Sequence, residues 1–229
     1  MKRKISKRFK KLIELSADKK LQLVDDAIKK IKNNCTTKFD ESIDISCKLN
    51  LKQKKDEVGI RTNVNLPNGN GKKVKVAVLC EESKIQEAKD GGAEIFGSDN
   101  IINDVTAGKI NFDKLIATPA MMPKMGKLGK ILGPKGLMPN PKLGTVTNNV
   151  KSAIKALKDG QIEIRNDKDG NIAASIGKKS FTDDKIKQNL DAFYETILKE
   201  KPDGIKGDYI LSSFLTSSMG ISYKIKLGK

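Results

Sequence analysis

The stretch LPNGNGKKVKVAVLC, residues 66–80, decides how the chain is divided, because two different hydrophobic patterns meet in it. Proline, asparagine and glycine in residues 66–71 interrupt the chain as a turn or linker does. Residues 73–80 then read KVKVAVLC, a nearly continuous apolar run. Such a run is typical of a strand that is buried on both faces of a parallel sheet. We therefore place a domain boundary between residues 66 and 67.

Downstream of this boundary, short strand and helix patterns alternate. Strand patterns occur at residues 73–80, 94–97 and 114–119, and helix patterns at residues 83–93, 98–110 and 148–158. This alternation is typical of an α/β unit with a parallel sheet. Residues 67–159 are therefore predicted to form such a unit.

Both ends of the chain show a different pattern. Amphipathic helices are predicted over the basic N-terminal segment, from near Ser16–Asp18 through Ile31, and over residues 182–200. Alternating strands are predicted at residues 42–49, 58–66, 211–220 and 221–227, with a hairpin over residues 161–177 that turns at Asp169-Gly170. Neither end has enough elements for a stable sheet alone. We therefore expect residues 1–66 and 160–229 to form one layered α+β domain, into which the α/β unit is inserted.

The chain is strongly basic. Lysine and arginine number 45 against 28 acidic residues, a formal net charge of +17 over 229 residues. An excess of this size is common in proteins that neutralise nucleic-acid phosphates and much less common in enzymes of small neutral substrates. We expect a polyanionic partner and no small-molecule substrate.

Histidine is absent, which excludes most metal sites and every histidine-based acid–base or nucleophilic mechanism. Cys35, Cys47 and Cys80 are too widely spaced for a zinc knuckle or a disulfide framework, so we expect buried, reduced thiols. The prediction is a protein that is not an enzyme, with no catalytic residue, metal or cofactor.

Neither a membrane span nor a signal peptide is predicted. The longest apolar run, residues 76–80, is far too short to cross a bilayer, and no basic segment has an obvious aromatic or leucine-rich face. The N-terminal MKRKISKRFKKL lacks the apolar region and cleavage site of a signal peptide. We expect a cytosolic protein without a membrane partner.

Residues 121–147, MMPKMGKLGKILGPKGLMPNPKLGTVT, hold recurring glycine, proline and lysine without a single acid. This composition argues against an ordinary packed helix or strand, whereas the many Met, Leu and Ile residues argue against a flexible linker. We interpret the stretch as a packed, ordered loop that presents lysines and backbone amides to phosphates. The lysines concerned are Lys124, Lys127, Lys130, Lys135 and Lys142. A neutral surface loop is the alternative.

A second candidate surface combines TKFDES, residues 37–42, with SSMG, residues 217–220. Both put small hydroxyls beside one apolar residue and a sharp turn. Hydroxyls and exposed apolar edges can read riboses and unstacked bases. A helix cap or strand end is the competing interpretation, because capping is the usual role of serine and threonine.

Two other classes of function were weighed. A nucleotide-dependent α/β enzyme would need a phosphate loop, but the glycines of residues 69–73 precede a strand instead of following one, and no Walker motif is present. A nonspecific nucleic-acid-binding architectural protein, of the kind that coats DNA, remains an alternative.

The sequence resembles the bacterial large-subunit ribosomal protein L1 family. KRFKKL, TKFDES, ILGPKGLMPNPKLGTVT, IEIRNDKDGNI and TSSMG occur in the order, and at roughly the spacing, of that family. The resemblance covers essentially the whole chain. It implies a split two-domain architecture with a Rossmann-like, three-layer insertion. It also implies binding to large-subunit rRNA in the mobile stalk near the tRNA exit site, and repression of translation through the protein's own operon mRNA.

The resemblance further implies which residues contact RNA. They are Lys38, Phe39, Ser42, Arg165, Lys168, Ser212, Ser218, Met219 and Gly220, with the five lysines of residues 121–147 as a secondary contact. TSSMG stands where the family often has TTTMG, so the hydroxyl is kept and a methyl is lost. The expected partners are large-subunit rRNA, the operon mRNA, tRNA at the exit site and other ribosomal components. The expected location is the ribosome in the cytoplasm.

Overall fold

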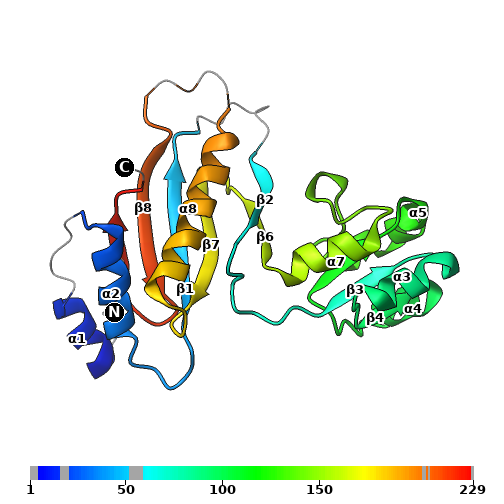
Figure 1. The fold of residues 1–229 in the computed structure, drawn as a ribbon, viewed down its shortest axis with the longest axis horizontal. Helices are drawn as coiled ribbons and strands as arrows, with labels where there is room; N and C mark the ends of the chain where they lie inside the picture. Colours follow the sequence, from blue (N-terminus) through cyan, green and yellow to red (C-terminus); the bar gives the residue numbers. More distant parts are fainter. Residues whose placement is uncertain (1–4, 16–20, 52–58, 203–204, 206, 228–229) are drawn as a thin grey trace. The chain divides into compact units, whose positions relative to one another are not determined.

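The computed structural model describes residues 5–15, 21–51, 59–202, 205 and 207–227. The chain divides into two compact units, Met1–Gly71 with Ile162–Lys229, and Lys72–Gln161 (Figure 1). Residues 67–71 belong with the first unit because the Asn189 side chain holds them. Its Oδ1 accepts from the Asn68 amide at 3.0 Å, and its Nδ2 donates to the Gly69 carbonyl at 2.8 Å.

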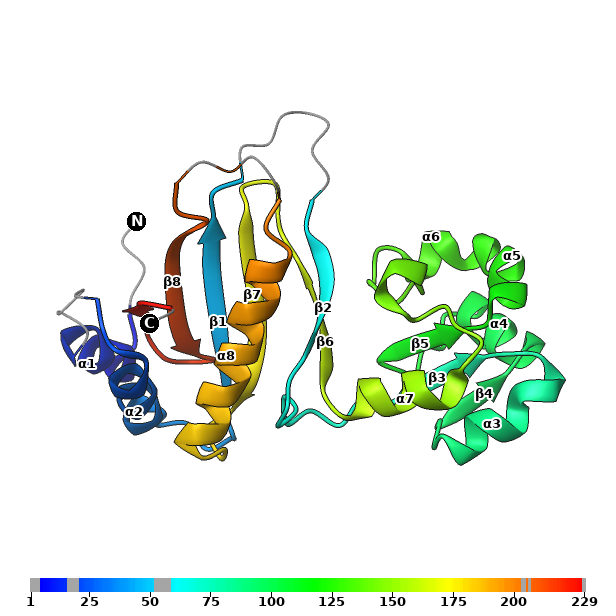
Figure 2. The same ribbon diagram turned by 45° about the horizontal axis from the view of Figure 1, so that its top comes forward.

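The first unit is built on a four-stranded antiparallel sheet in the order β7-β1-β8-β9. The strands are β1 (Ser42–Leu49), β7 (Asn171–Lys178), β8 (Ile210–Ser217) and β9 (Tyr223–Ile225). Helices α2 (Val24–Asn34) and α8 (Asp183–Lys199) cover one face of this sheet (Figure 2). The first and last quarters of the chain therefore share one sheet.

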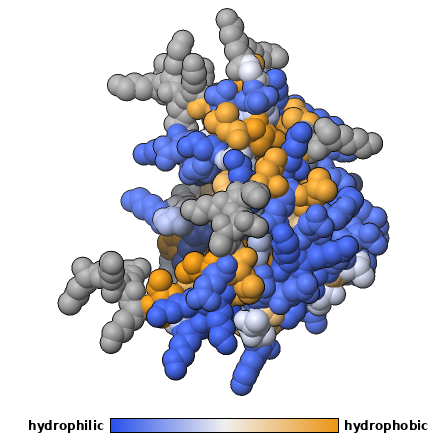
Figure 3. All heavy atoms as spheres, turned by 90° about the vertical axis from the view of Figure 1, so that its left-hand side faces the viewer, coloured by the Kyte–Doolittle hydropathy of each residue, from blue (hydrophilic) through white to orange (hydrophobic). Residues whose placement is uncertain are grey.

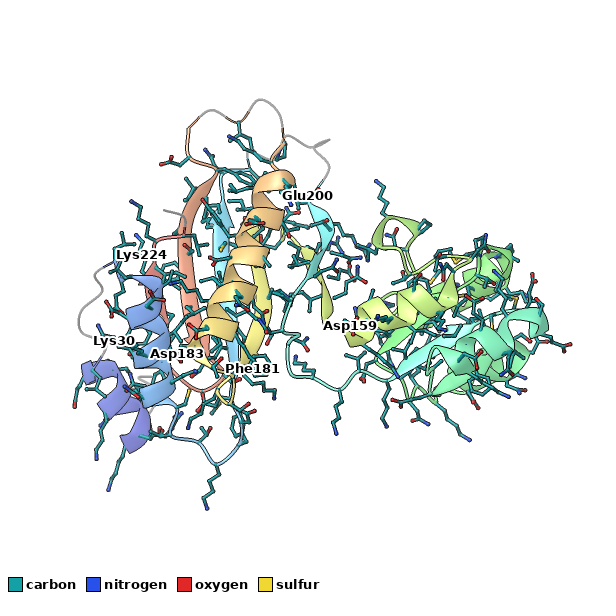
Figure 4. All side chains as sticks on the ribbon, viewed as in Figure 1. Lys30, Asp159, Phe181, Asp183, Glu200 and Lys224 are labelled. Carbon is teal, nitrogen blue, oxygen red and sulfur yellow. The ribbon has the colours of Figure 1, made fainter. Side chains whose placement is uncertain are left out.

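The core of this unit lies between the sheet and the two helices. Residues spaced for one helical face bury their side chains in α8, as predicted: Ile186, Leu190, Phe193 and Ile197. Lys32 of α2 pairs with Asp183 and donates to the Phe181 carbonyl at the start of α8 (Figure 4). The two helices are thus joined by an ion pair at one end and by apolar packing along their length.

Helix α2 begins later than the periodicity suggested. The predicted start near Ser16–Asp18 lies outside the described residues. Leu21 is exposed, and Gln22 forms a parallel bridge with Ile225 of β9. Helix α1 (Lys7–Leu15) buries only Leu12. The leucine-rich segment before α2 is therefore extended chain beside the sheet.

The predicted hairpin over residues 161–177 is wrong in its pairing. A turn does form: the Gly170 amide donates to the Asp167 carbonyl at 3.2 Å, and Gly170 has a positive φ of 78°. However, β6 (Gln161–Arg165) pairs with β2 (Arg61–Asn65), whereas β7 pairs with β1. The local turn signal was correct, but distant segments supply the strand partners. Val58, the predicted start of β2, lies outside the described residues.

The second unit holds the predicted parallel sheet, in the order β4-β3-β5. Its strands are β3 (Val76–Leu79), β4 (Ile95–Gly97) and β5 (Lys114–Ala117), and its helices are η1 (Glu82–Lys84), α3 (Ile85–Asp90), α4 (Asp99–Thr106) and α7 (Val150–Lys158). Ala77 and Leu79 pack into one apolar cluster, and Val76 and Val78 into another. Strand β3 is thus buried on both faces, as its valine run predicted.

Residues 119–147 are packed, as predicted. The sequence suggested a loop without helices, but the structure has short helices in this segment. Five short turns follow one another: η2 (Pro119–Met121), α5 (Met122–Met125), η3 (Gly126–Leu128), α6 (Gly129–Leu132) and η4 (Pro141–Leu143). Buried apolar side chains hold them down: Met121, Met125, Leu128, Leu132 and Leu143. Prolines and glycines keep each helix short, while the i, i+3 and i, i+4 spacing of apolar residues lets the turns pack.

The three cysteines are buried and free, as predicted. Burial raises the pKa of Cys47 to about 12 and also raises that of Cys35 and Cys80. Among the described residues, no helix is long and apolar enough to cross a membrane.

Candidate nucleic-acid interface

TKFDES and TSSMG meet at one end of the four-stranded sheet, where β1 begins and β8 ends. The Ser218 amide donates to the Ser42 carbonyl at 3.0 Å, and the Ser42 amide donates to the Ser218 Oγ at 3.1 Å. The Ser218 hydroxyl lies 3.4 Å from the Ser42 carbonyl, to which it donates. Residues 176 positions apart are therefore joined by one backbone hydrogen bond and by two hydrogen bonds of the Ser218 hydroxyl. We call residues 36–42 and 217–220 the loop edge.

The loop edge presents two large apolar side chains to solvent. Phe39 is 53% exposed and Met219 is 50% exposed, and Lys38 beside Phe39 is also exposed. An aromatic ring, a flexible thioether and an ammonium group together can stack on a base and pair with a phosphate. The structure thus brings together the predicted residues Lys38, Phe39, Ser42 and 218–220.

Gly220 leaves no space for a larger residue. A Cβ at this position would overlap the Ser217 Oγ. Ser217 is buried, and its carbonyl accepts from the Gly220 amide at 3.2 Å. A larger residue at position 220 would therefore displace the Ser217 hydroxyl, which hydrogen-bonds to Glu41, or shift the turn.

A buried carboxylate lies behind the loop edge. Glu41 is fully buried, and its Oε1 accepts from the Thr37 Oγ1 at 2.7 Å. Its Oε2 accepts from the Met219 amide at 3.1 Å, and the Ser217 side chain also hydrogen-bonds to it. Burial favours the neutral acid, but these hydrogen bonds outweigh it and hold the pKa of Glu41 below its ordinary value of 4.5. Glu41 is therefore ionised at neutral pH.

Arg8 reaches the loop edge from helix α1. Its Nη2 donates to the Met219 carbonyl at 2.7 Å, and its Nη1 donates to the Thr36 Oγ1 at 3.2 Å. Figure 3 views the molecule from the side on which α1 and α2 lie in Figure 1. Hydrophilic side chains cover most of this face, with separate apolar patches between them. Neither Glu41 nor Arg8 was among the predicted site residues.

Ser212, Arg165 and Lys168 do not lie at the loop edge. Ser212 pairs with Lys48 near the far end of β1, and Lys48 also pairs with Asn171. Ser212 and Ser218 are six positions apart, or about 20 Å along an extended strand. The predicted RNA-binding residues therefore fall into two groups at opposite ends of the sheet.

Two members of the second group, Arg165 and Lys168, border a groove of about 610 Å³. The groove is lined by Gly59, Ile60, Arg61, Arg165, Asn166, Asp167 and Lys168. Arg61 pairs with Glu163 at 2.8 Å, whereas Arg165 and Lys168 are exposed. Among the described residues, the buried Asn166 Oδ1 has no hydrogen-bond partner. The groove therefore combines exposed cationic side chains with a buried amide oxygen.

The sheet face turned away from the helices connects the two groups. Its central row places Ala173, Ser46, Phe214 and Lys224 side by side on β7, β1, β8 and β9. The next row places Asp44 between Ser175 and Thr216. The strand alternation of SIDISCKL could have identified this hydroxyl-bearing face, because it puts residues 42, 44, 46 and 48 on the side away from the core.

The five predicted secondary contacts lie in the second unit. Lys124, Lys127, Lys130, Lys135 and Lys142 are all exposed. Lys124 pairs with Asp99 at 3.3 Å. A parallel bridge between Ala117 and Val146 attaches the end of this segment to β5. The segment thus presents exposed lysines from a backbone that packs against the second unit.

These features define a class of protein. The fold is mixed α/β with several sheets, the chain is strongly basic, and the described residues contain no cluster of three or more Cys, Asp or Glu side chains that could hold a metal ion. Exposed hydroxyls, lysines and apolar tips are suited to binding. The class is that of a basic binding protein with a mixed α/β fold.

Comparison with known proteins gives the family. Residues 29–221 match the model of the Ribosomal protein L1p/L10e family. Large ribosomal subunit protein uL1 from Pelagibacter ubique is 60% identical over 225 residues, which cover 98% of each chain. The proteins of the same name from Rickettsia peacockii and Rickettsia akari are 50% and 49% identical over 201 residues, 88% of this chain and 84% of each relative.

The chain belongs to the ribosomal protein L1p/L10e family. The family resemblance predicted from the sequence is confirmed. The protein has a structural ribosomal role and is not an enzyme, and the predicted location at the ribosome in the cytoplasm is confirmed by the same relatives.

Proposed function

We propose that this protein is a constituent of the large ribosomal subunit that binds large-subunit rRNA and forms the mobile stalk near the tRNA exit site. In this position it contacts tRNA and neighbouring ribosomal components and assists the release of deacylated tRNA. Family membership and relatives named as large-subunit proteins support the proposal. The proposal also rests on the resemblance of TKFDES, TSSMG and residues 121–147 to the family motifs.

The observation that carries RNA binding is the loop edge. Phe39 and Met219 are half exposed, and the hydroxyl-bearing segments beside them are fixed by hydrogen bonds. Exposed apolar side chains on an ordered turn can stack on unpaired bases, which occur in RNA loops and bulges and not in duplex DNA. In a chain of net charge +17, this surface favours structured RNA as the partner.

The nine predicted residues are proposed to contact different parts of the RNA. In the proposed complex, Phe39, Met219 and Gly220 face bases, and Lys38, Arg165 and Lys168 face phosphates. Ser42, Ser212 and Ser218 lie near riboses. The five exposed lysines of the second unit add a secondary, less specific contact. The rRNA then follows the open sheet face from the loop edge to the groove at Arg165.

We also propose that the two compact units are domains. The discontinuous one, assigned from the sequence to residues 1–66 and 160–229, binds RNA, and residues 67–159 form a Rossmann-like insertion. The contact-defined units and the parallel β4-β3-β5 sheet support this division. Repression of the protein's own operon follows if the same surface binds a similar structure in its mRNA.

Competition binding at one salt concentration tests the function. Labelled large-subunit stalk rRNA is bound to the protein, and unlabelled stalk rRNA, operon mRNA or duplex DNA is added. We expect both RNAs to compete at least 100-fold better than DNA, which is below the range common for specific over nonspecific sites. Equal competition by duplex DNA would instead support a nonspecific architectural protein.

A further inference from the structure

Two charged side chains from different segments hold the backbone of Met219. The Glu41 Oε2 accepts from its amide at 3.1 Å, and the Arg8 Nη2 donates to its carbonyl at 2.7 Å. Hydrogen bonds to ionised groups are stronger than neutral ones. Both polar backbone groups of this residue are thus fixed, while its thioether stays half exposed.

The same two side chains reach the loop that carries Phe39. The Glu41 Oε1 accepts from the Thr37 Oγ1 at 2.7 Å, and the Arg8 Nη1 donates to the Thr36 Oγ1 at 3.2 Å. The Thr37 hydroxyl also lies 3.3 Å from the Phe39 carbonyl. The carboxylate and the guanidinium therefore each bridge the two loops that present the exposed apolar side chains.

We propose that Glu41 and Arg8 are positioning residues that set the spacing and orientation of Phe39 and Met219 for RNA. This inference rests on the proposed rRNA-binding function. The two residues act through the loops they bridge, and their loss misplaces the apolar tips without removing either tip. We call the pair the clamp. Glu41 bonds to both loops from its buried position, and Arg8 bonds to both loops on the solvent-exposed side.

The chemistry of the clamp requires a carboxylate at position 41. Thr37 and Met219 both direct hydrogen-bond donors at this side chain, one at each oxygen. Glutamine has one acceptor oxygen, so its amide nitrogen would face one of these donors. Cys35, buried nearby, and Lys179, whose amide donates to the Glu41 carbonyl at 2.8 Å, are the other titratable groups here. Burial raises the pKa of the Cys35 thiol, so this group stays neutral at neutral pH and does not replace the carboxylate as an acceptor.

The outer half of the clamp requires a guanidinium at position 8. One guanidinium nitrogen contacts each loop, a fork geometry that the single ammonium of lysine does not reproduce. Arg8 also lies outside the family match, which begins at residue 29. Helix α1 therefore adds a contact to the loop edge that the matched region does not contain.

Variants of the full chain test the proposal through the kinetics of binding to the stalk rRNA. Arg8→Lys keeps the charge but not the fork, and Arg8→Met removes both. Lys11→Met is the matched control, because it removes one cation from an exposed position on the same helix. Glu41→Gln is compared with Glu14→Gln, which removes one exposed carboxylate from α1. A misplaced contact raises the dissociation rate, whereas a lost remote charge mainly lowers the association rate.

We expect Arg8→Lys and Glu41→Gln each to raise the dissociation rate about tenfold at an unchanged salt slope. Lys11→Met should lower only the association rate, by less than about threefold. In the free protein, NMR should show a shifted Met219 methyl signal in the Arg8 and Glu41 variants alone. Arg8→Lys changes only exposed contacts, those to Thr36 and Met219, so its melting temperature should stay near that of the wild type.

The outcomes separate this inference from the proposed function. Wild-type protein that prefers duplex DNA to stalk rRNA would refute the function, while the methyl shift would still report on the clamp. Wild-type affinity and dissociation rate in Arg8→Lys, or equal kinetics in Arg8→Met and Lys11→Met, would overturn the positioning role.

Discussion

The loop edge and the lysine-bearing turns of residues 119–147 are two ways of presenting a binding surface. At the loop edge, hydrogen bonds from Glu41, Arg8 and Ser218 fix short segments whose exposed groups are few. In residues 119–147, buried apolar side chains fix the backbone, and five lysines extend from it on flexible stems. Fixed hydroxyls and apolar tips discriminate between sequences, whereas lysines attract any phosphate. Specificity and most of the affinity are therefore expected to lie in the first unit, and the lysines of the second unit are expected to add a weaker, nonspecific contribution.

Separating the units should give the largest effect. A protein in which a short linker joins residues 1–71 to 162–229 should fold, because it keeps the whole four-stranded sheet, and it should retain most of the affinity for stalk rRNA. The isolated 72–161 unit should bind about 1,000-fold more weakly than the full chain. Filter binding and circular dichroism check both fragments. Tight, specific binding by residues 72–161 alone would reverse the assignment of the two surfaces.

Gly220→Ala should distort the loop edge. The added Cβ overlaps the Ser217 Oγ, so either this hydroxyl or the turn has to move, and we expect a loss of about 2 kcal/mol of unfolding free energy and of rRNA affinity. Gly126→Ala is the control, because a Cβ at that helical position meets nothing within 4 Å. Denaturant unfolding and rRNA binding measure the two effects. A variant at position 220 as stable and tight-binding as the control would show that the turn is adaptable.

Ser218→Val tests whether the Ser218 hydroxyl contacts RNA directly or only links β8 to β1 through Ser42. The Ser218 Oγ already accepts from the Ser42 amide, which agrees with the strand-end interpretation, but the residue is exposed and can also face a ribose. We expect Ser218→Val to lose about tenfold in cognate affinity, with Ser218→Thr close to wild type. The salt slope should not change.

Melting curves separate the two roles of Ser218. Loss of affinity with an unchanged melting temperature supports a direct contact. If affinity falls only in proportion to stability, the hydroxyl is structural.

Lys168→Ala should give the smallest effect. Removing one exposed cation weakens binding to cognate and nonspecific RNA alike, by about threefold, and makes the slope of log K against log salt shallower by about one unit. A titration over several salt concentrations with both RNAs measures this. An effect confined to the cognate RNA would mean that the groove beside Arg165 is part of the specific surface.

Much of the fold could be predicted because local patterns determine it. The valine run of β3 and the apolar face of α8 both lie where periodicity places them. The predicted hairpin pairing was wrong because turn residues report only on local structure, whereas β6 pairs with β2, a strand about 100 residues earlier. The helices in residues 119–147 were missed because each is only about one turn long.

The exposed residues of the candidate site could be predicted from the sequence, but the residues that hold them in place, Glu41 and Arg8, could not. Phe39, Ser218 and Met219 stand in recognisable motifs. Glu41 reads as one more surface acid in TKFDES, and only the closed sheet shows that it is buried. Arg8 and Met219 are 211 positions apart, so no local pattern could relate them.

The sheet order β7-β1-β8-β9 has a consequence for biosynthesis. Strand β1 is synthesised early, but its neighbour β8 and the edge strand β9 come more than 160 residues later in the chain. Residues 72–161 contain a complete sheet and can fold during translation, since domains generally fold as units in order of synthesis. The loop edge closes only when residues 210–225 pair. A nascent chain therefore cannot engage RNA through this surface until residues 210–225 have been synthesised.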